Sequence, residues 1–290
     1  MSTTLTMENI QYNQGLIPEL SHLKNDKGSL SKHAFFFDLD GTLLDIASAP
    51  HKVQLPQQLY DILSHLHWHL DGALALITGR PVSFVDTIFP SHSFEIAGLH
   101  GAQIRNSDGS IRALKIDDSF RTAKRYIEDT LTDYPDIKLE DKEVALALHY
   151  RSNPRLQKTT TDIINKAASI TGDNWTVQHG KMVAELRPAG SDKGSALDHF
   201  MAKAAFQSRI PIAFGDDATD EAMFAAAHKY SGASVKIGAS LQQSCAMSLL
   251  SSPSALRNWL TEIIAAQGTL RVPEPAINHP SNKVETDWGH

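Results

Sequence analysis

Asp38 and Asp40 form the first pair of residues in this sequence that could do chemistry together. They follow the short apolar run 34–37 and stand directly before Gly41. One carboxylate can attack an electrophile while its neighbour moves a proton, and both can help to hold a divalent cation that screens their repulsion. The alternative is an acidic turn after a core strand. A calcium-binding loop is set aside, because its consensus requires a further ligand before the glycine.

A second acidic group consists of Asp216, Asp217, Asp220 and Glu221, and it follows the apolar run 210–214. Oxygen ligands of this kind suit magnesium, so the group predicts a site for a hard cation. The alternative is a helix that begins with acidic residues, which the helix dipole favours.

Thr78 ends a third apolar run, 73–77, and the next residues are Gly79, Arg80 and Pro81. Proline is well tolerated at the first position of a helix, so we expect a helix to begin there. A hydroxyl and unpaired backbone amides at a helix N-terminus form a natural phosphate site. The alternative is a plain turn between strand and helix.

Lys193 lies in the first turn of another helix, for which we expect Ser191 to be the N-cap. A positive charge at that end opposes the helix dipole, which is unfavourable unless an anion lies nearby. This local conflict indicates a functional role for the lysine.

Short continuous apolar runs are typical of strands that are buried on both faces of a parallel sheet. We therefore predict an α/β fold with a doubly wound, Rossmann-like parallel sheet, and a site beyond the carboxyl ends of its strands. Between about 117 and 187 the pattern changes to alternation, in the order helix, strand, strand, helix, strand, strand. That order predicts an inserted α+β unit with helices on one face of its sheet and an open second face.

The domain boundaries follow from these patterns. Residues 33–114 and 190–266 are predicted to form the catalytic core, and 115–189 the inserted unit. Residues 1–32 are polar and weakly patterned, so we expect a mobile leader, and 267–290 read as a disordered tail.

The open face of the inserted sheet offers polar side chains for a ligand. Alternation over 143–151 places His149 and Arg151 on one face together with two alanines. Lys181 and Glu185 share a face of a neighbouring strand and could grip sugar hydroxyls. They could equally form a solvated rim.

Composition excludes several classes of protein. The formal net charge is −6, which argues against a nucleic-acid binder. Cys245 is the only cysteine, so a disulfide framework and a cysteine-rich zinc site are both excluded. The sequence has no secretory signal pattern and no apolar run long enough to span a bilayer, so we expect no membrane partner and a cytoplasmic location.

Taken together, the four motifs resemble those of the haloacid dehalogenase superfamily: Asp-Leu-Asp-Gly-Thr at 38–42, Thr-Gly-Arg at 78–80, Lys193, and Gly-Asp-Asp-Ala-Thr-Asp-Glu at 215–221. Four further segments, at 97–102, 147–151, 180–185 and 234–238, are similar to the trehalose-6-phosphate phosphatase family. The resemblance runs from about Phe35 to Leu260 and implies a C2-type cap as the inserted unit. Gln103 departs from it, because bacterial members often carry glutamate there.

The resemblance implies a mechanism for the core residues. Asp38 would attack phosphorus and form an aspartyl-phosphate, and Asp40 would act as general acid and then general base. Thr78 and Lys193 would bind phosphoryl oxygens. Magnesium would be the cofactor, and its ligands would be drawn from Asp38, Asp40, Asp216, Asp217 and Asp220.

It also implies the substrate, a small phosphorylated disaccharide. The candidates for binding it are Arg80, Gly98, His100, His149, Arg151, Lys181 and Glu185. The reaction would be hydrolysis of trehalose 6-phosphate, the last step of trehalose biosynthesis, by a protein for which a monomer is favoured.

Two other functions stay open. Another capped sugar-phosphate phosphatase or a phosphomutase would share the core and differ in the cap. A catalytically silent sugar sensor on the same fold would be expected to lack Asp38, Asp40 or Lys193, and all three are present.

Overall fold

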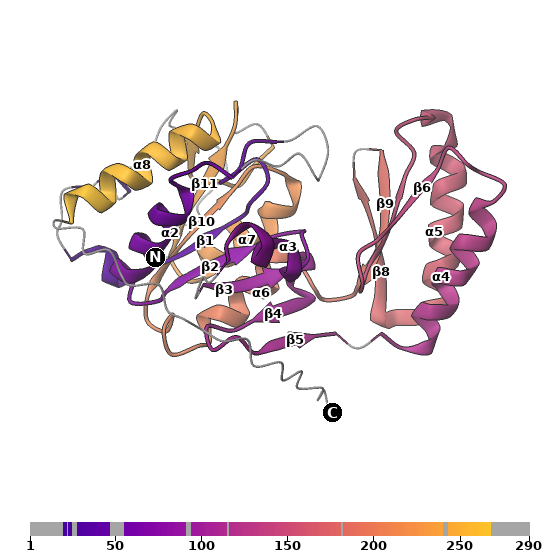
Figure 1. Ribbon diagram of the computed structural model, residues 1–290, viewed down its shortest axis with the longest axis horizontal. Helices are drawn as coiled ribbons and strands as arrows, with labels where there is room; N and C mark the ends of the chain where they lie inside the picture. The colour runs from indigo at the N-terminus through magenta and orange to yellow at the C-terminus, as the bar shows by residue number, and fades with distance from the viewer. Residues whose placement is uncertain are drawn as a thin grey trace, which may run out of the picture.

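The structure is a computed structural model that describes residues 20–21, 23–24, 28–46, 55–90, 94–114, 116–180, 182–239 and 243–267. Two units stand side by side, one built on an eight-stranded sheet and one on a four-stranded sheet (Figure 1). The larger unit contains both ends of the described chain, and the smaller one is inserted between them.

The larger sheet is parallel over most of its width. Its strands are β1 (His33–Phe37), β2 (Leu74–Ile77), β3 (Glu95–Gly98), β4 (Gln103–Arg105), β5 (Ile111–Ala113), β10 (Ile210–Gly215), β11 (Ala233–Ile237) and β12 (Ser248–Leu250). They lie in the order β12-β11-β10-β1-β2-β3-β4-β5, and β4 is antiparallel to both of its neighbours, β3 and β5. The strand order reverses between β1 and β10, and the ends of strands at such a switch point leave a crevice for ligands.

Helices cover both faces of this sheet, as predicted. They are α2 (Leu59–His69), α3 (Val82–Ile88), α6 (Lys193–Met201), α7 (Glu221–Lys229) and α8 (Pro253–Ala266), with the short 3₁₀ turns η2 (Leu30–Lys32), η4 (Leu99–Gly101) and η7 (Ala218–Asp220). Successive residues of a strand point to opposite faces. Accordingly, Phe35 of β1 stacks on Trp259 of α8 at 6.3 Å, whereas Phe36 stacks on Phe200 of α6 at 6.4 Å.

Part of the segment that was predicted to be a mobile leader packs against the core in the structure. Leu20, Leu23 and Leu30 are each at most 2% exposed and belong to the main hydrophobic core. The backbone N–H of Gly28 donates to the side chain of Gln267, at the end of α8. The leucines bury apolar area that would otherwise face water, which holds this segment on the core. The predicted disordered tail from 268 onwards lies outside the described residues.

The smaller unit has the predicted order of helix, strand, strand, repeated once. Its elements are α4 (Asp118–Leu131), β6 (Lys138–Asp141), β7 (Leu146–His149), η5 (Pro154–Leu156), α5 (Gln157–Thr171), η6 (Gly172–Asn174), β8 (Trp175–Gly180) and β9 (Val183–Pro188). The antiparallel sheet, β6-β7-β9-β8, turns one face toward the larger unit, and α4 and α5 lie on the other side (Figure 1). We call this unit the cap; its boundaries at 115 and 189 stay a prediction.

Candidate active site

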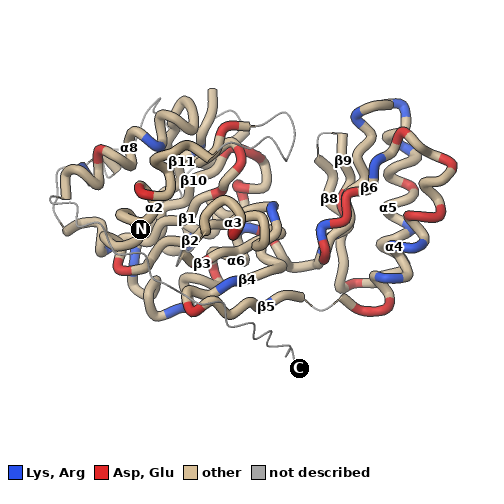
Figure 2. Tube along the Cα trace, in the orientation of Figure 1, with Lys and Arg blue, Asp and Glu red and all other residues tan. Residues whose placement is uncertain are grey.

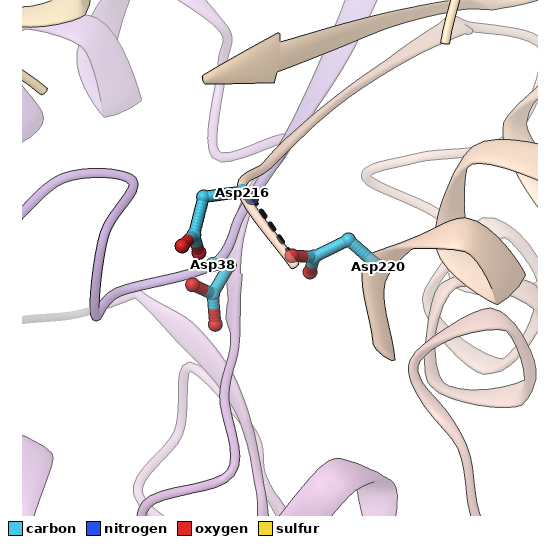
Figure 3. Close-up of side chains that lie close together, drawn as sticks. All are labelled: Asp38, Asp216 and Asp220. Carbon is cyan, nitrogen blue, oxygen red and sulfur yellow. Dashed lines mark hydrogen bonds between the residues drawn. The ribbon is translucent and has the colours of Figure 1, made fainter. Parts of the chain in front are cut away.

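Three carboxylates converge where β1 and β10 end (Figure 3). Asp38 follows β1, Asp216 follows β10, and Asp220 closes the η7 turn. One oxygen of each carboxylate lies within 4.8 Å of the others, and Asp38 and Asp220 are 4% and 0% exposed. The predicted convergence of the two acidic groups is therefore present in the fold.

Lys193 provides positive charge to this cluster. Its buried Nζ donates to Oδ1 of Asp38 at 2.7 Å and to Oδ1 of Asp220 at 2.8 Å. Burial opposes the charged form, but the two carboxylates more than compensate and raise the pKa of Lys193 above its ordinary value. The ammonium group is therefore fixed as a cation beside Asp38.

The helix that carries Lys193 is capped differently from the prediction. Asp192, not Ser191, is the N-cap of α6: its carboxylate accepts from the N–H of Ser195, whose hydroxyl accepts in return from the N–H of Asp192. A charged carboxylate at this end also interacts favourably with the helix dipole, which a serine hydroxyl does only weakly. The cap fixes the first turn of α6 and with it the direction of Lys193.

Asp220 already accepts three hydrogen bonds. Besides Lys193, it receives the backbone N–H groups of Asp216 and Asp217 on Oδ2, at 2.9 and 3.0 Å. Gly215 makes room for it, since a Cβ there would lie 2.2 Å from Cγ of Asp220. Asp217 turns elsewhere, accepting from the N–H and the hydroxyl of Thr219. Asp220 thus positions the loop and the lysine.

The cluster fits a divalent cation. Burial and the charges of Asp220 and Asp217 raise the pKa of Asp216 to about 7, which means that the folded chain disfavours the charged form of this carboxyl group. A cation bound nearby would stabilise that charged form. Gly41, at φ +86°, lets the loop after β1 approach closely, because a Cβ there would lie 2.2 Å from Oδ2 of Asp216. Carboxylate oxygens form the donor set that magnesium prefers.

Asp40 lies at the mouth of the site and is held by Arg80. The guanidinium donates from Nε and Nη2 to the two oxygens of Asp40, both at 2.7 Å, and packs over the ring of Phe84 at 4.5 Å. The hydroxyl of Thr78 accepts from the N–H of Arg80 at 3.1 Å, which leaves its own proton for an anion. The predicted general acid/base and the predicted substrate-binding arginine are therefore neighbours.

A cavity of about 450 Å³ connects these groups to the cap. It is lined by Asp38, Asp40, Thr78, Gly79, Arg80, Pro81, Phe84, His100, Glu140, Lys142, Lys193, Asp217 and Thr219. Charged residues of both signs lie on the side of the cap that faces the core (Figure 2). The cavity therefore joins an acidic end in the core to a polar end in the cap.

Two cap residues line this cavity, Glu140 and Lys142, and neither was predicted from the sequence. Glu140 accepts from His149 at 2.7 Å, and Lys142 binds Glu185 at 3.1 Å. The first pair joins the neighbouring strands β6 and β7, and the second joins the turn after β6 to β9. The predicted residues His149 and Glu185 therefore reach the cavity through partners. The available signal was that Glu140 and Lys142 are two positions apart, as residues on one face of a strand are.

The remaining predicted substrate residues lie in three different settings. Gly98 is buried beneath the turn after β2, where a Cβ would lie 2.8 Å from the N–H nitrogen of Val82. Arg151 lies on the exposed turn that follows β7. Lys181 falls outside the described residues. The roles assigned to all three in substrate binding stay predictions.

Comparison with known proteins agrees with this geometry. A family model described as trehalose-phosphatase matches residues 36–252, which is most of the chain. The chain belongs to the trehalose-phosphatase family. This confirms the resemblance expected from the motifs. The match spans the core motifs before and after the cap as well as the cap itself.

Two relatives show how far the trehalose-phosphatase resemblance extends. A Sinorhizobium fredii protein named probable trehalose-phosphate phosphatase is 40% identical over 87% of this chain and 93% of its own length. An Escherichia coli trehalose-6-phosphate phosphatase is 37% identical over 73% of this chain and 80% of its own.

A solved Bacteroides thetaiotaomicron protein, described among phosphatases of the haloalkanoate (HAD) enzyme superfamily, shares the fold. The TM-score is 0.54 at 18% identity, over 87% of this chain and 99% of that one. With the sheet order above, it confirms the predicted fold class. Among the described helices, none combines the length and apolar character needed to cross a membrane.

His100 gives the trehalose-phosphatase site a neutral ring beside its cations. Burial and the charges of Lys193 and Lys142 lower the pKa of His100 to about 3. The ring packs against Gly79, where a Cβ would lie 2.8 Å from Nε2, and its Nδ1 is buried with no hydrogen-bond partner among the described residues. The ring can therefore offer a neutral hydrogen bond to a ligand.

We expect His100→Gln to change how stability depends on pH. The pKa of His100 is lowered on folding from its ordinary 6.5, so the unfolded chain takes up the extra proton and stability falls as pH drops below about 6.5. Relative to wild type, the variant should gain about 1–2 kcal/mol between pH 7.5 and pH 5, measured by urea unfolding. The exposed His179 offers a control, His179→Gln, and an equal gain there would contradict the assignment.

Proposed function

We infer that this protein hydrolyses trehalose 6-phosphate to trehalose and phosphate, the last step of trehalose biosynthesis. Family membership and the E. coli relative, which bears the name of that activity at 37% identity, support the substrate. The observation that carries the chemistry is the cavity that joins the Asp38–Lys193 pair to the polar cap residues Glu140 and Lys142.

Asp38 is the nucleophile in this proposal. Its Oδ1 is held by Lys193, which leaves Oδ2 to attack phosphorus in line and form an aspartyl-phosphate. The ammonium of Lys193 and the hydroxyl of Thr78 then bind phosphoryl oxygens and stabilise the charge that gathers on them. Water subsequently attacks the phosphorus of the intermediate, which releases phosphate and restores the carboxylate.

Asp40 carries the protons. It gives one to the sugar oxygen that leaves, and in the second half-reaction it takes one from the attacking water. Arg80, which lines the cavity together with Asp40, holds both of its oxygens through the paired hydrogen bonds described above. A residue without a transferable proton at this position would leave the intermediate to persist.

We propose that Mg²⁺ is the cofactor, held by carboxylate oxygens of Asp38 and Asp216 and by the backbone carbonyl of Asp40. When bound, it would neutralise charge on the phosphoryl group and on these carboxylates. Asp220 and Asp217 support the site through the hydrogen bonds that fix its loop, since their oxygens already accept from Lys193 or from N–H and hydroxyl donors.

The cap selects the sugar in this proposal. Glu140 and Lys142 present charged groups that can exchange hydrogen bonds with sugar hydroxyls, and His100 does so from the core. Glu185 holds Lys142 in place. His149 holds Glu140 in place, and Arg151 and Lys181 are further candidates for closing over the disaccharide. Contact between cap and core around the ligand would exclude bulk water.

We also propose a cytoplasmic, monomeric enzyme.

Phosphate release from a panel of sugar phosphates tests the proposed substrate. The purified protein is assayed with trehalose 6-phosphate, sucrose 6-phosphate, glucose 6-phosphate and mannose 6-phosphate. A strong preference for the first supports the proposal. Comparable rates on the monosaccharides would favour another capped sugar-phosphate phosphatase, conversion of glucose 6-phosphate to an isomer would favour a phosphomutase, and no turnover of any would favour the sensor.

Removal of divalent cations should stop the reaction. We expect EDTA to lower the rate at least about 100-fold, and Mg²⁺ to restore it better than Ca²⁺, which prefers more ligands at longer distances. Asp216→Asn should raise the Mg²⁺ concentration for half-maximal activity at least about tenfold. Asp45→Asn, an exposed aspartate that pairs with Arg257, is the control. Full activity in EDTA after dialysis would refute the cofactor assignment.

A further inference from the structure

Gln103 connects the core to the cap through a single buried side chain. Its amide is part of a residue only 6% exposed at the start of β4. The amide oxygen accepts from the N–H of Val82, the first residue of α3, at 3.0 Å, and the amide nitrogen donates to Oε2 of Glu143 in the cap at 2.7 Å. One side chain thus holds both the helix after the Thr-Gly-Arg motif and a turn of the cap.

The turn that Gln103 reaches lies between β6 and β7, and it contains Lys142. Glu143 adopts φ +70°, and its N–H donates to Asp141 at 3.0 Å. The N–H of Val144 donates to the carbonyl of Lys142 at 2.8 Å, which makes the turn tight. Because Lys142 directly precedes Glu143, a contact that fixes Glu143 also fixes the residue that lines the cavity.

An apolar contact lies beside this hydrogen bond. Val144 of the cap, 4% exposed, packs with Leu99 and Ala102 of the core in a small cluster of its own. Leu99 is the chain neighbour of His100, a core residue that lines the same cavity as Lys142 of the cap. Apolar packing holds the turn near the core but has no directional preference, whereas the hydrogen bond of Gln103 sets its orientation.

We propose that Gln103 is a positioning residue for substrate binding: through Glu143 it holds the cap turn in the orientation that places Lys142 at the cavity. The inference rests on the proposed function for its substrate. If only a fraction of molecules holds the turn correctly, the apparent affinity for the sugar phosphate equals the intrinsic affinity multiplied by that fraction. The phosphoryl site itself, built from Asp38 and Lys193, does not involve Gln103.

A side-chain amide can serve both ends of this contact. It accepts a hydrogen bond from one backbone N–H and at the same time donates one to a carboxylate. A carboxylate at 103 would still accept from Val82, but it would face the carboxylate of Glu143 with no proton between them. Glutamate and glutamine have nearly the same shape, so Gln103→Glu changes the contact with little change in packing.

The experiment compares four variants by steady-state kinetics with trehalose 6-phosphate at pH 7.5. Gln103→Glu should raise KM about three- to tenfold and leave kcat within about twofold, as expected for repulsion between partly screened charges. Glu143→Gln should resemble wild type, since its amide oxygen still accepts. The double variant should recover a wild-type KM, because the new amide donates to the new carboxylate. Gln207→Glu, on an exposed core side chain, is the charge-matched control.

The proposal is overturned if Gln103→Glu leaves KM unchanged. It is also overturned if adding Glu143→Gln does not return KM to the wild-type value, because the first substitution would then have caused a general structural defect. Hydrogen exchange gives a readout without substrate: the amide of Val144 should exchange faster in Gln103→Glu and recover in the double variant. An unchanged exchange rate in Gln103→Glu would refute the role of Gln103, whatever the substrate of the enzyme. Failure of the wild-type protein to hydrolyse trehalose 6-phosphate would refute only the proposed function.

Discussion

Asp38→Asn should abolish phosphate release from trehalose 6-phosphate, with a loss in kcat of about 10⁴-fold or more. An amide of the same shape has no nucleophilic oxygen, so the covalent step cannot occur. The fold should persist, because the amide oxygen can still accept the hydrogen bond from Lys193 and the residue keeps its buried packing. Stopped assays for phosphate, with circular dichroism on the same samples, give both quantities.

Asp198→Asn provides the matched control, because Asp198 lies on α6 and contacts Lys229, at 3.8 Å, and the hydroxyl of the exposed Tyr230. It should retain wild-type activity. Acid-stable radioactivity should not accumulate on Asp38→Asn after incubation with labelled substrate, whereas trapping of the wild-type intermediate should label the protein. Retained turnover in Asp38→Asn would refute the nucleophile assignment.

Lys193→Met should damage both stability and activity. The variant leaves Asp38 and Asp220 buried without their cation, and breaking a buried ion pair on one side costs about 3–5 kcal/mol. In the absence of divalent cations we expect a loss of that size in the free energy of unfolding at pH 7.5. Activity should fall about 100- to 1,000-fold with the loss of phosphoryl stabilisation.

The pH dependence separates this effect from a simple packing defect. Without the lysine, burial and mutual repulsion raise the pKa values of the two carboxyl groups above their unfolded values, so the folded state binds the additional protons. The variant should therefore regain stability as pH falls from 7.5 to 5. Lys229→Met, at an exposed lysine, should stay within about 0.5 kcal/mol of wild type at both values. A pH-independent deficit in Lys193→Met would contradict this explanation.

The sequence by itself determined the fold class and the centre of the site. Apolar runs that end in acids, a threonine or a glycine identify buried parallel strands, and the carboxyl ends of such strands meet at one edge of a sheet. Asp38, Asp216 and Thr78 could therefore be placed together before any contact was known. Each of these inferences depends only on local pattern and on a general rule of α/β topology.

Only the tertiary structure decided the contacts between the core and the cap. The 103–143 hydrogen bond and the cavity positions of Glu140 and Lys142 depend on how the cap sheet faces the core. Likewise, the burial of Leu20 depends on an apolar surface that α8 and its neighbours create. Such contacts join residues far apart in the chain, and local pattern carries no information on distance or orientation between separately folded surfaces. Periodicity identifies which face of an element is polar or apolar, whereas its partner is fixed only when the elements pack.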